Sequence, residues 1–255
     1  MLIYHRVGGG SDSAVDLPID TFAAQLEYLT AHHRVVSLDD AVGLLAGSQP
    51  DGWIASHQTS AMPDEHLVAI TFDDGTADFA EHAAPLLVEH GLPATLFVTT
   101  QYIDHGVDFP WGAPPTSWNA LADACSTGLI HIGNHSHSHA LFDRIDVAAA
   151  RAEIERSAGL ITERLGVDAP HFAYPKAIPP SPHNEIEVRR RFASASLAGN
   201  RVNRFGASDL HRIARTPIRR DDDLATFARH CRGGSMLEGA LRDGLASVRY
   251  RARTT

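Results

Sequence analysis

The stretch LVAITFDDGTADFAEHAAPLLVEHGLPATLFVT, residues 67–99, contains the pattern that decides the fold. Leu67–Phe72 is short, apolar and partly β-branched, which predicts a buried strand. A helix is expected over residues 77–90, where Gly91 ends it, and Ala94–Thr99 predicts the next strand. A strand, a helix and a second strand in this order form a unit whose two strands run parallel.

The same alternation of short apolar runs and helical stretches extends to both ends of the chain. Further strands are expected at Leu2–Tyr4, Arg34–Val36, Leu129–Gly133, His171–Tyr174 and Ala193–Leu197, with shorter ones near Leu210–Ile213 and Thr216–Ile218. Helices are expected between them and over residues 223–231 and 236–248. This alternation predicts a mainly parallel α/β sheet, open or closed into a barrel, with ligands at the carboxyl ends of the strands.

The chain shows neither an internal repeat nor a low-complexity linker, so residues 1–255 are predicted to form a single domain. Residues 48–65 and 101–116 contain prolines and no clear hydrophobic period, which is typical of surface loops. Residues 249–255 are basic and are expected to form a frayed tail.

The composition limits the classes of function. The 255 residues carry a formal net charge of −9, which argues against general nucleic-acid binding because that function needs a basic surface. No apolar run approaches the length of about 20 residues that a membrane span needs, and the first residues lack a signal peptide's apolar segment. A cytoplasmic protein is therefore expected, with an exported form left open. Cys125 and Cys231 cannot form a disulfide framework, whereas sixteen histidines are many for this length.

Two adjacent carboxylates follow the expected strand Leu67–Phe72 directly. In the segment Thr71–Gly75 (TFDDG), Asp73 and Asp74 lie where the backbone leaves the strand, so both side chains can reach one pocket. A hydrolytic metal site needs one carboxylate that binds the ion and a second that takes a proton from water. A turn or a helix N-cap explains the same residues, and for this motif alone that interpretation is the stronger.

Histidines follow a second expected strand, Leu129–Gly133. His135 and His139 are four residues apart, so one helical turn would place both rings on one side, with His137 pointing away. Neutral imidazoles suit zinc and similar divalent ions. With Asp74, the two histidines would supply three ligands and leave positions open for water and substrate, which is typical of a catalytic site. A polar loop with incidental histidines is less attractive, because both motifs follow strands of one predicted sheet.

These motifs resemble those of the polysaccharide deacetylases, carbohydrate esterase family 4 or the NodB-homology domain. Thr71–Gly75 and His135–His139 match the first two family motifs in order and separation, and Phe172–Pro175 (FAYP) resembles the third. The opening Tyr4–Val7 (YHRV) resembles the start of the bacterial branch that includes exopolysaccharide deacetylases. The resemblance covers nearly the whole chain and implies an α/β fold, a distorted (β/α) barrel of about seven parallel strands.

The resemblance also implies a hydrolase that removes acetyl groups from sugars with the help of one divalent ion. Zinc is the first choice, and cobalt, nickel, manganese and iron also suit the ligands. Asp73 matches the family's catalytic base, which takes a proton from the water that attacks the acetyl carbonyl. Asp74, His135 and His139 match the metal ligands. The implied substrate is an acetylated sugar or polysaccharide that carries N-acetyl or O-acetyl groups.

Three residues are predicted to bind this substrate. Lys176 takes the family's oxyanion-donor position through its main chain, and Tyr174 belongs to the same motif. The ammonium group of Lys176 could favour an acidic substrate, although a solvated lysine is an equal interpretation. Trp111 lies among glycine and prolines and is the candidate to stack on a sugar ring.

The later motifs depart from the family pattern. His211 is the nearest match to the family's general-acid histidine, with its spacing off by one. Arg215, or His5 after the first strand, could lie near the same pocket. The family's Asp-Trp element is absent from residues 199–209. Two other functions therefore stay open, a cyclic-amide hydrolase of the allantoinase-like branch and a degenerate domain that only binds glycans.

Overall fold

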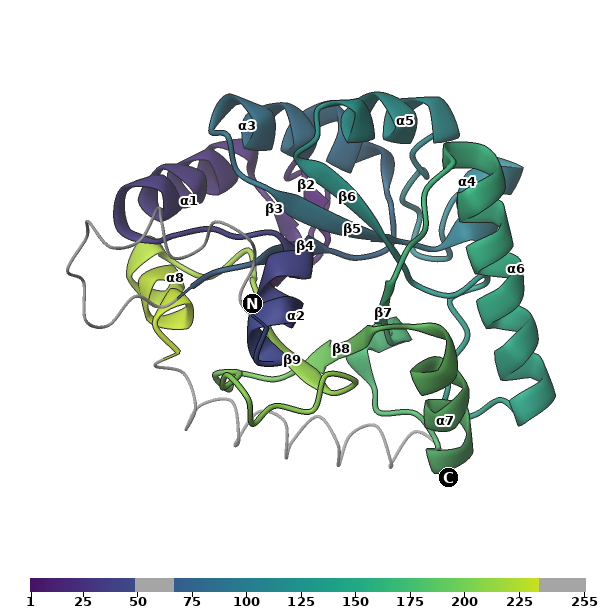
Figure 1. Cartoon of the computed structure of the whole chain (residues 1–255). Coiled ribbons are helices and arrows are strands. Elements are labelled where there is room, and N and C mark those ends of the chain that lie inside the picture. Colours follow the sequence, from purple (N-terminus) through teal and green to yellow (C-terminus); the bar gives the residue numbers. More distant parts are fainter. Residues whose placement is uncertain (49–66, 234–255) are drawn as a thin grey trace.

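Seven short parallel strands lie side by side and close into a barrel in the computed structural model, which describes residues 1–48 and 67–233 (Figure 1). Their order around the barrel is β1 (Leu2–Tyr4), β4 (Ile70–Phe72), β5 (Ala94–Val98), β6 (Ile130–Asn134), β7 (His171–Ala173), β8 (Ser194–Ala198) and β9 (Ile213–Pro217). The barrel closes because β9 pairs with β1, with Leu2 opposite Thr216. This confirms the predicted parallel α/β barrel. A small second sheet joins β2 (Arg6–Val7) to β3 (Asp16–Leu17).

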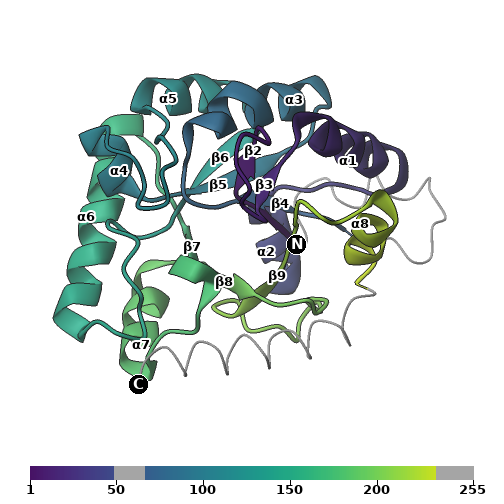
Figure 2. The ribbon, with the colours of Figure 1, turned by 180° about the vertical axis from the view of Figure 1, so that it is seen from behind.

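Helices surround the barrel in both opposite views (Figures 1 and 2). They are α1 (Ile19–His32), α2 (Leu38–Leu45), α3 (Ala84–Glu89), α4 (Thr100–His105), α5 (Trp118–Ser126), α6 (Val147–Leu165), α7 (Pro182–Arg191) and α8 (Leu224–Cys231), with a π-helical turn η1 (Phe79–Ala83) and a 3₁₀ turn η2 (Pro175–Ala177). Five of them begin at a Ser or Asp whose side chain accepts a main-chain N–H, namely Ser37, Ser117, Asp146, Ser181 and Asp223. These residues are favoured N-caps because they satisfy donors that have no partner within the helix.

The structure differs from the sequence prediction in several places. The two short strands expected near Leu210–Ile213 and Thr216–Ile218 are replaced by the single strand β9, because Ile213–Arg215 pair with β8 and Thr216–Pro217 pair with β1. The stretch expected as a loop over residues 101–116 begins with helix α4, which ends at Gly106 in the left-handed region with φ 62°. The helix expected over 77–90 starts with the wider turn η1, because Pro85 has no N–H for an α-helical hydrogen bond. The expected strand Arg34–Val36 is reduced to one bridge, between Val35 and Val68. The predictions for 49–65, 236–248 and 249–255 lie outside the described residues.

The ring of Phe97, on β5, packs against residues of β6 and β9. Phe97 is fully buried, and Gly133 leaves room for it, because a Cβ on that glycine would lie 2.3 Å from the Phe97 ring. The guanidinium of Arg215 lies over the same ring, 4.9 Å from its centroid. This packing supports the site from below.

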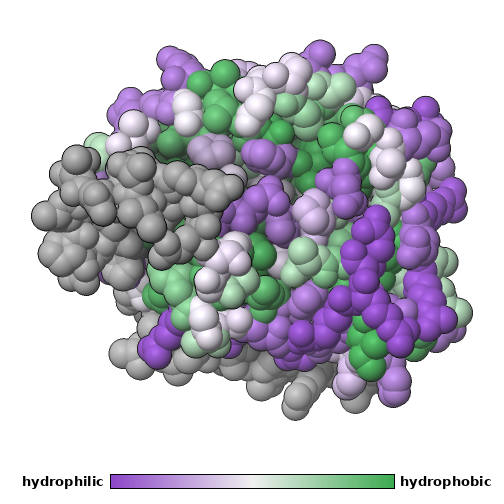
Figure 3. All heavy atoms as spheres, in the orientation of Figure 1, coloured by the Kyte–Doolittle hydropathy of each residue, from purple (hydrophilic) through white to green (hydrophobic). Residues whose placement is uncertain are grey.

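The outer surface is mixed in character. Figure 3 shows hydrophilic side chains gathered over α7, where Arg151 and Arg190 both pair with Glu187. Among residues 1–48 and 67–233, no helix combines the length and the apolar character required to cross a membrane.

Candidate metal centre at the carboxyl ends of the strands

Three ligand-type side chains converge where β4 and β6 end. Asp74 follows β4, and both histidines follow β6. The Oδ1 atom of Asp74 lies 3.6 Å from Nε2 of His135 and 3.4 Å from Nε2 of His139. The ligand atoms of the three residues all lie within 4.8 Å of one another. We call Asp74, His135 and His139 the triad.

The triad fits a divalent ion by geometry and by donor type. Bonds of about 2.0–2.1 Å to nitrogen and oxygen in a tetrahedron place neighbouring ligand atoms about 3.4 Å apart, which the Asp74 distances approach. The Nδ1 atom of His135 lies 2.7 Å from the carbonyl oxygen of Ala173, so that its other nitrogen faces the triad. Two nitrogens and one oxygen suit zinc and other borderline divalent ions.

The protonation of the triad agrees with that fit. Burial lowers the pKa of His135 to about 4, and burial together with the nearby His135 lowers the pKa of His139 to about 3. Both rings are therefore neutral at pH 7, which is the form that binds metals. Burial, followed by the charges of Asp73 and Asp78, raises the pKa of Asp74 to about 8. A cation among these atoms would offset the cost of ionising Asp74.

The loops that hold the triad have unusual backbone conformations. Within the described residues, the non-glycine residues with positive φ are Asp74, Ser136, His139, Lys176 and Ala177, and all lie in the three motif loops. Such conformations cost about 1–3 kcal/mol each and cluster at functional sites. The predicted helical turn between His135 and His139 is wrong. Two left-handed residues in a non-helical loop bring the rings together instead.

Asp73 is held beside the triad by a buried arginine. The guanidinium of Arg215 donates to both carboxylate oxygens of Asp73, at 2.7 and 2.9 Å, and to the hydroxyl of Thr71 at 3.0 Å. Burial by itself would raise the pKa of Asp73, but the charge and hydrogen bonds of Arg215 together with the nearby His135 and His5 outweigh it, so the pKa is lowered to about 2. Asp73 is therefore ionised at neutral pH and oriented by two hydrogen bonds.

The two histidines considered as general acids lie in different places. His5 follows β1 directly, and the main-chain N–H of Asp73 donates to the carbonyl of the preceding Tyr4 at 3.0 Å. Burial lowers the pKa of His5, and nearby Asp73 raises it in part. His211 instead lies before the amino-terminal end of β9, and its Nε2 is 2.8 Å from the carbonyl oxygen of Phe192, before β8. The structure therefore does not bring His211 to the triad.

The three predicted substrate-binding residues also lie in different surroundings. Trp111 is 45% exposed, and its ring meets the ring of His139 edge-on at 5.6 Å between centroids, so it flanks the triad. Lys176 is exposed, and its charge acts on His139. Tyr174 is fully buried and packs against Phe172, 5.2 Å between ring centroids, so its side chain belongs to the core rather than to a cleft.

Two residues of the site had no such role in the sequence analysis. Arg215 was considered only as a residue near the pocket, whereas the structure makes it the partner of Asp73. A lone arginine within an otherwise uncharged strand is the signal that could have revealed this, because a buried charge needs a partner. Glu153 binds the histidine loop from α6, and no local pattern indicates that contact.

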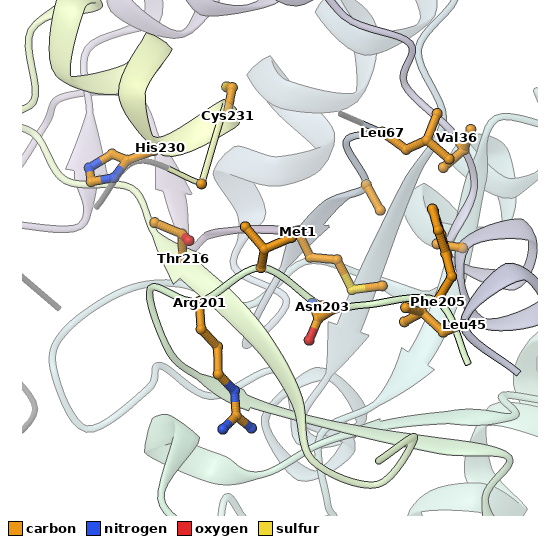
Figure 4. Close-up of a pocket in the computed structure, with 14 residues that line it drawn as sticks. Met1, Val36, Leu45, Leu67, Arg201, Asn203, Phe205, Thr216, His230 and Cys231 are labelled. Atoms are coloured by element: carbon orange, nitrogen blue, oxygen red, sulfur yellow. The ribbon is translucent and has the colours of Figure 1, made fainter. Parts of the chain in front are cut away.

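A separate cavity of about 120 Å³ lies beside the start of β1 (Figure 4). Most of its lining residues are apolar, and the lining includes Met1, Val36, Leu45, Phe205, His230 and Cys231. None of the triad residues lines it. It is therefore distinct from the candidate metal centre.

Comparison with known proteins agrees with this geometry. The sequence profile described as Polysaccharide deacetylase matches residues 60–187. The Bacillus subtilis (strain 168) protein YxkH, provisionally named a polysaccharide deacetylase, is 28% identical over 106 residues, which are 41% of this chain and 33% of YxkH. The matched stretch thus spans about a third of that relative's length.

Solved structures share the fold. The deacetylase PplD of Streptococcus pyogenes, in complex with acetate, has a TM-score of 0.74 and 17% identity, over 90% of this chain and 96% of that one. IcaB from Ammonifex degensii has a TM-score of 0.73 and 24% identity, over 91% and 95% of the two chains. Because the family profile covers half of the sequence and the barrel matches, the chain belongs to the polysaccharide deacetylase family.

Proposed function

We propose that the protein is a metal-dependent deacetylase that removes acetyl groups from a carbohydrate. The observation that carries the proposal is the buried triad beside an arginine-bound carboxylate, Asp73, at the carboxyl ends of the barrel strands. Family membership supports the same reaction class. A divalent ion held by the triad would supply Lewis acidity toward the acetyl carbonyl and would lower the pKa of water.

The protein residues would supply base, acid and substrate contacts. Asp73 is ionised and held in place by Arg215, so it can accept the proton of the attacking water. His5 is the acid that we propose, because it adjoins Asp73 while His211 lies elsewhere. Its lowered pKa leaves it neutral at rest, and negative charge on the substrate would favour its protonation.

Substrate contacts are proposed for two exposed residues. The indole of Trp111 stacks on Phe109, with centroids 4.9 Å apart, and presents its free face beside His139. A sugar ring could pack on that face, since aromatic rings bury large apolar areas. The main-chain N–H of Lys176, in a left-handed conformation near the triad, is the proposed donor to the developing oxyanion.

Acetate release tests the proposal. The purified protein is stripped of metal with a chelator, reloaded with Zn²⁺ or Co²⁺, and incubated with N-acetylated and O-acetylated oligosaccharides. We expect acetate only from the reloaded protein, and a loss of at least about 100-fold in Asp73→Asn and in His135→Ala. His183→Ala, a histidine exposed on α7, is the matched control and should retain full activity.

Three results would contradict the proposal. Acetate release that survives His135→Ala would remove the triad from the reaction. Glycan binding without acetate release, at full metal occupancy, would favour the non-catalytic alternative. Consumption of a cyclic amide with no acetate would favour the allantoinase-like reaction.

A further inference from the structure

One carboxylate outside the triad binds the loop between its two histidines. The Oε2 atom of Glu153, on α6, accepts the main-chain N–H of His137 at 3.0 Å and that of Ser138 at 2.7 Å. Its Oε1 atom accepts the Ser138 hydroxyl at 2.7 Å. One carboxylate thus accepts three hydrogen bonds from two consecutive residues, His137 and Ser138, directly before His139.

These hydrogen bonds satisfy main-chain groups that would be paired within a helix or a strand elsewhere in the fold. Residues 136–139 belong to neither a helix nor a strand, and Ser136 and His139 both have positive φ. Buried main-chain N–H groups require partners, and bonds to a carboxylate are among the stronger ones. On the other side, the carbonyl of His137 accepts the N–H of Gln101 at 2.9 Å, at the start of α4. The loop is therefore fixed between α4 and α6.

The two histidines of the triad are positioned differently. His135 continues β6, its N–H donates to Val98 at 3.0 Å, and its ring is oriented by the carbonyl of Ala173. His139 lies four residues farther along the loop, and its ring meets its neighbours, His135 and Trp111, edge-on. The position of His139 in space is therefore set by the preceding segment, residues 137–138, which Glu153 binds.

We propose that Glu153 is a positioning residue for His139 and thereby sets the affinity of the triad for its metal ion. The inference rests on the proposed metal-dependent function. Glu153 is not one of the triad ligands, and it acts through the main chain of His137 and through the main chain and hydroxyl of Ser138. Outer residues that orient metal ligands typically contribute about 10- to 100-fold to metal affinity.

The test measures Zn²⁺ affinity of the metal-free protein by chelator competition, together with the visible absorption spectrum of the Co²⁺ form. Glu153→Ala is expected to weaken Zn²⁺ binding by about 10- to 100-fold and to alter the Co²⁺ spectrum. Glu153→Gln should stay within about fivefold of wild type, because an amide oxygen can still accept both N–H groups without the charge. Glu155→Ala, an exposed glutamate on the same helix, is the matched control and should bind as wild type does.

A purely structural role predicts another pattern. Thermal unfolding of the metal-free forms would then show a lower melting temperature in Glu153→Ala with unchanged Zn²⁺ affinity, which would overturn the inference. Should Glu153→Ala fail to fold, Ser138→Ala removes one of the three hydrogen bonds and leaves α6 intact. We expect it to weaken Zn²⁺ binding by a smaller factor, and unchanged affinity would likewise overturn the inference.

The outcomes separate this inference from the function on which it rests. If the wild-type protein does not bind one Zn²⁺ ion per chain, both the role of Glu153 and the proposed function are overturned. A wild-type protein that binds Zn²⁺ and releases acetate, while Glu153→Ala and Ser138→Ala bind equally well, overturns only the role of Glu153.

Discussion

Replacement of Arg215 by methionine isolates the interaction that keeps Asp73 ionised. Both side chains are buried, and Arg215→Met removes the two hydrogen bonds of 2.7 and 2.9 Å from the carboxylate. Removing one partner of a buried ion pair typically costs about 3–5 kcal/mol, because a charge remains buried without compensation. We expect a loss of that size in the free energy of unfolding at pH 7, measured by urea denaturation.

The pH dependence of this loss carries the sharper test. In the wild type the pKa of Asp73 is lowered from 3.8 to about 2, so about 2 kcal/mol of stability is present above pH 3.8 and is lost as the pH falls toward 2. Without Arg215, burial raises the pKa of Asp73 above its ordinary value, and the variant loses stability as the pH rises above 3.8. The difference between wild type and variant should therefore be smaller at pH 5 than at pH 7.

A double-mutant cycle supplies the control. Asp73→Asn in the Arg215→Met background removes the buried carboxylate, so the double variant should be more stable at pH 7 than Arg215→Met alone. Acetate release should also show an acid limb at higher pH in Arg215→Met, since a protonated Asp73 cannot act as base. A stability difference that is equal at pH 5 and pH 7, and additive in the cycle, would refute the coupling of these two residues.

Three further predictions concern other parts of the site. His5→Ala should lower kcat by about 100-fold or more while His211→Ala leaves it within about twofold, because only His5 adjoins Asp73. Steady-state kinetics of acetate release measures both values. A larger loss in His211→Ala than in His5→Ala would restore His211 as the acid. Gly133→Ala should destabilise the fold by about 1–3 kcal/mol, since the new Cβ would lie 2.3 Å from the Phe97 ring. Urea denaturation measures this free energy of unfolding. As a matched check, adding Phe97→Leu should recover part of the lost stability. Trp111→Ala should raise KM for an oligosaccharide about tenfold, or ~1.4 kcal/mol. The melting temperature should change little, because the residue is 45% exposed. An unchanged KM would exclude sugar stacking on Trp111.

Much of the barrel could be predicted from local patterns. The apolar run of β4, the helix stops at Gly91 and Gly166, and the capping residues Asp146 and Asp223 are all properties of neighbouring residues. The prediction failed where contacts between distant segments decide the local structure. The proline-containing stretch after β5 was expected to be a loop throughout, yet α4 begins there, because the loop that follows β6 supplies carbonyl partners from Ser136 and His137.

The sequence by itself determined which residue types stand at the strand ends, because a TFDDG segment and paired histidines each follow a predicted strand. Only the tertiary structure decided how they work together. The triad forms because the neighbouring strands β4, β5 and β6 all end at the same mouth of the barrel. Arg215 reaches Asp73 from 142 residues away, and Glu153 reaches the histidine loop from another helix. Such long-range pairings depend on strand register and barrel closure, which no local stretch of sequence contains.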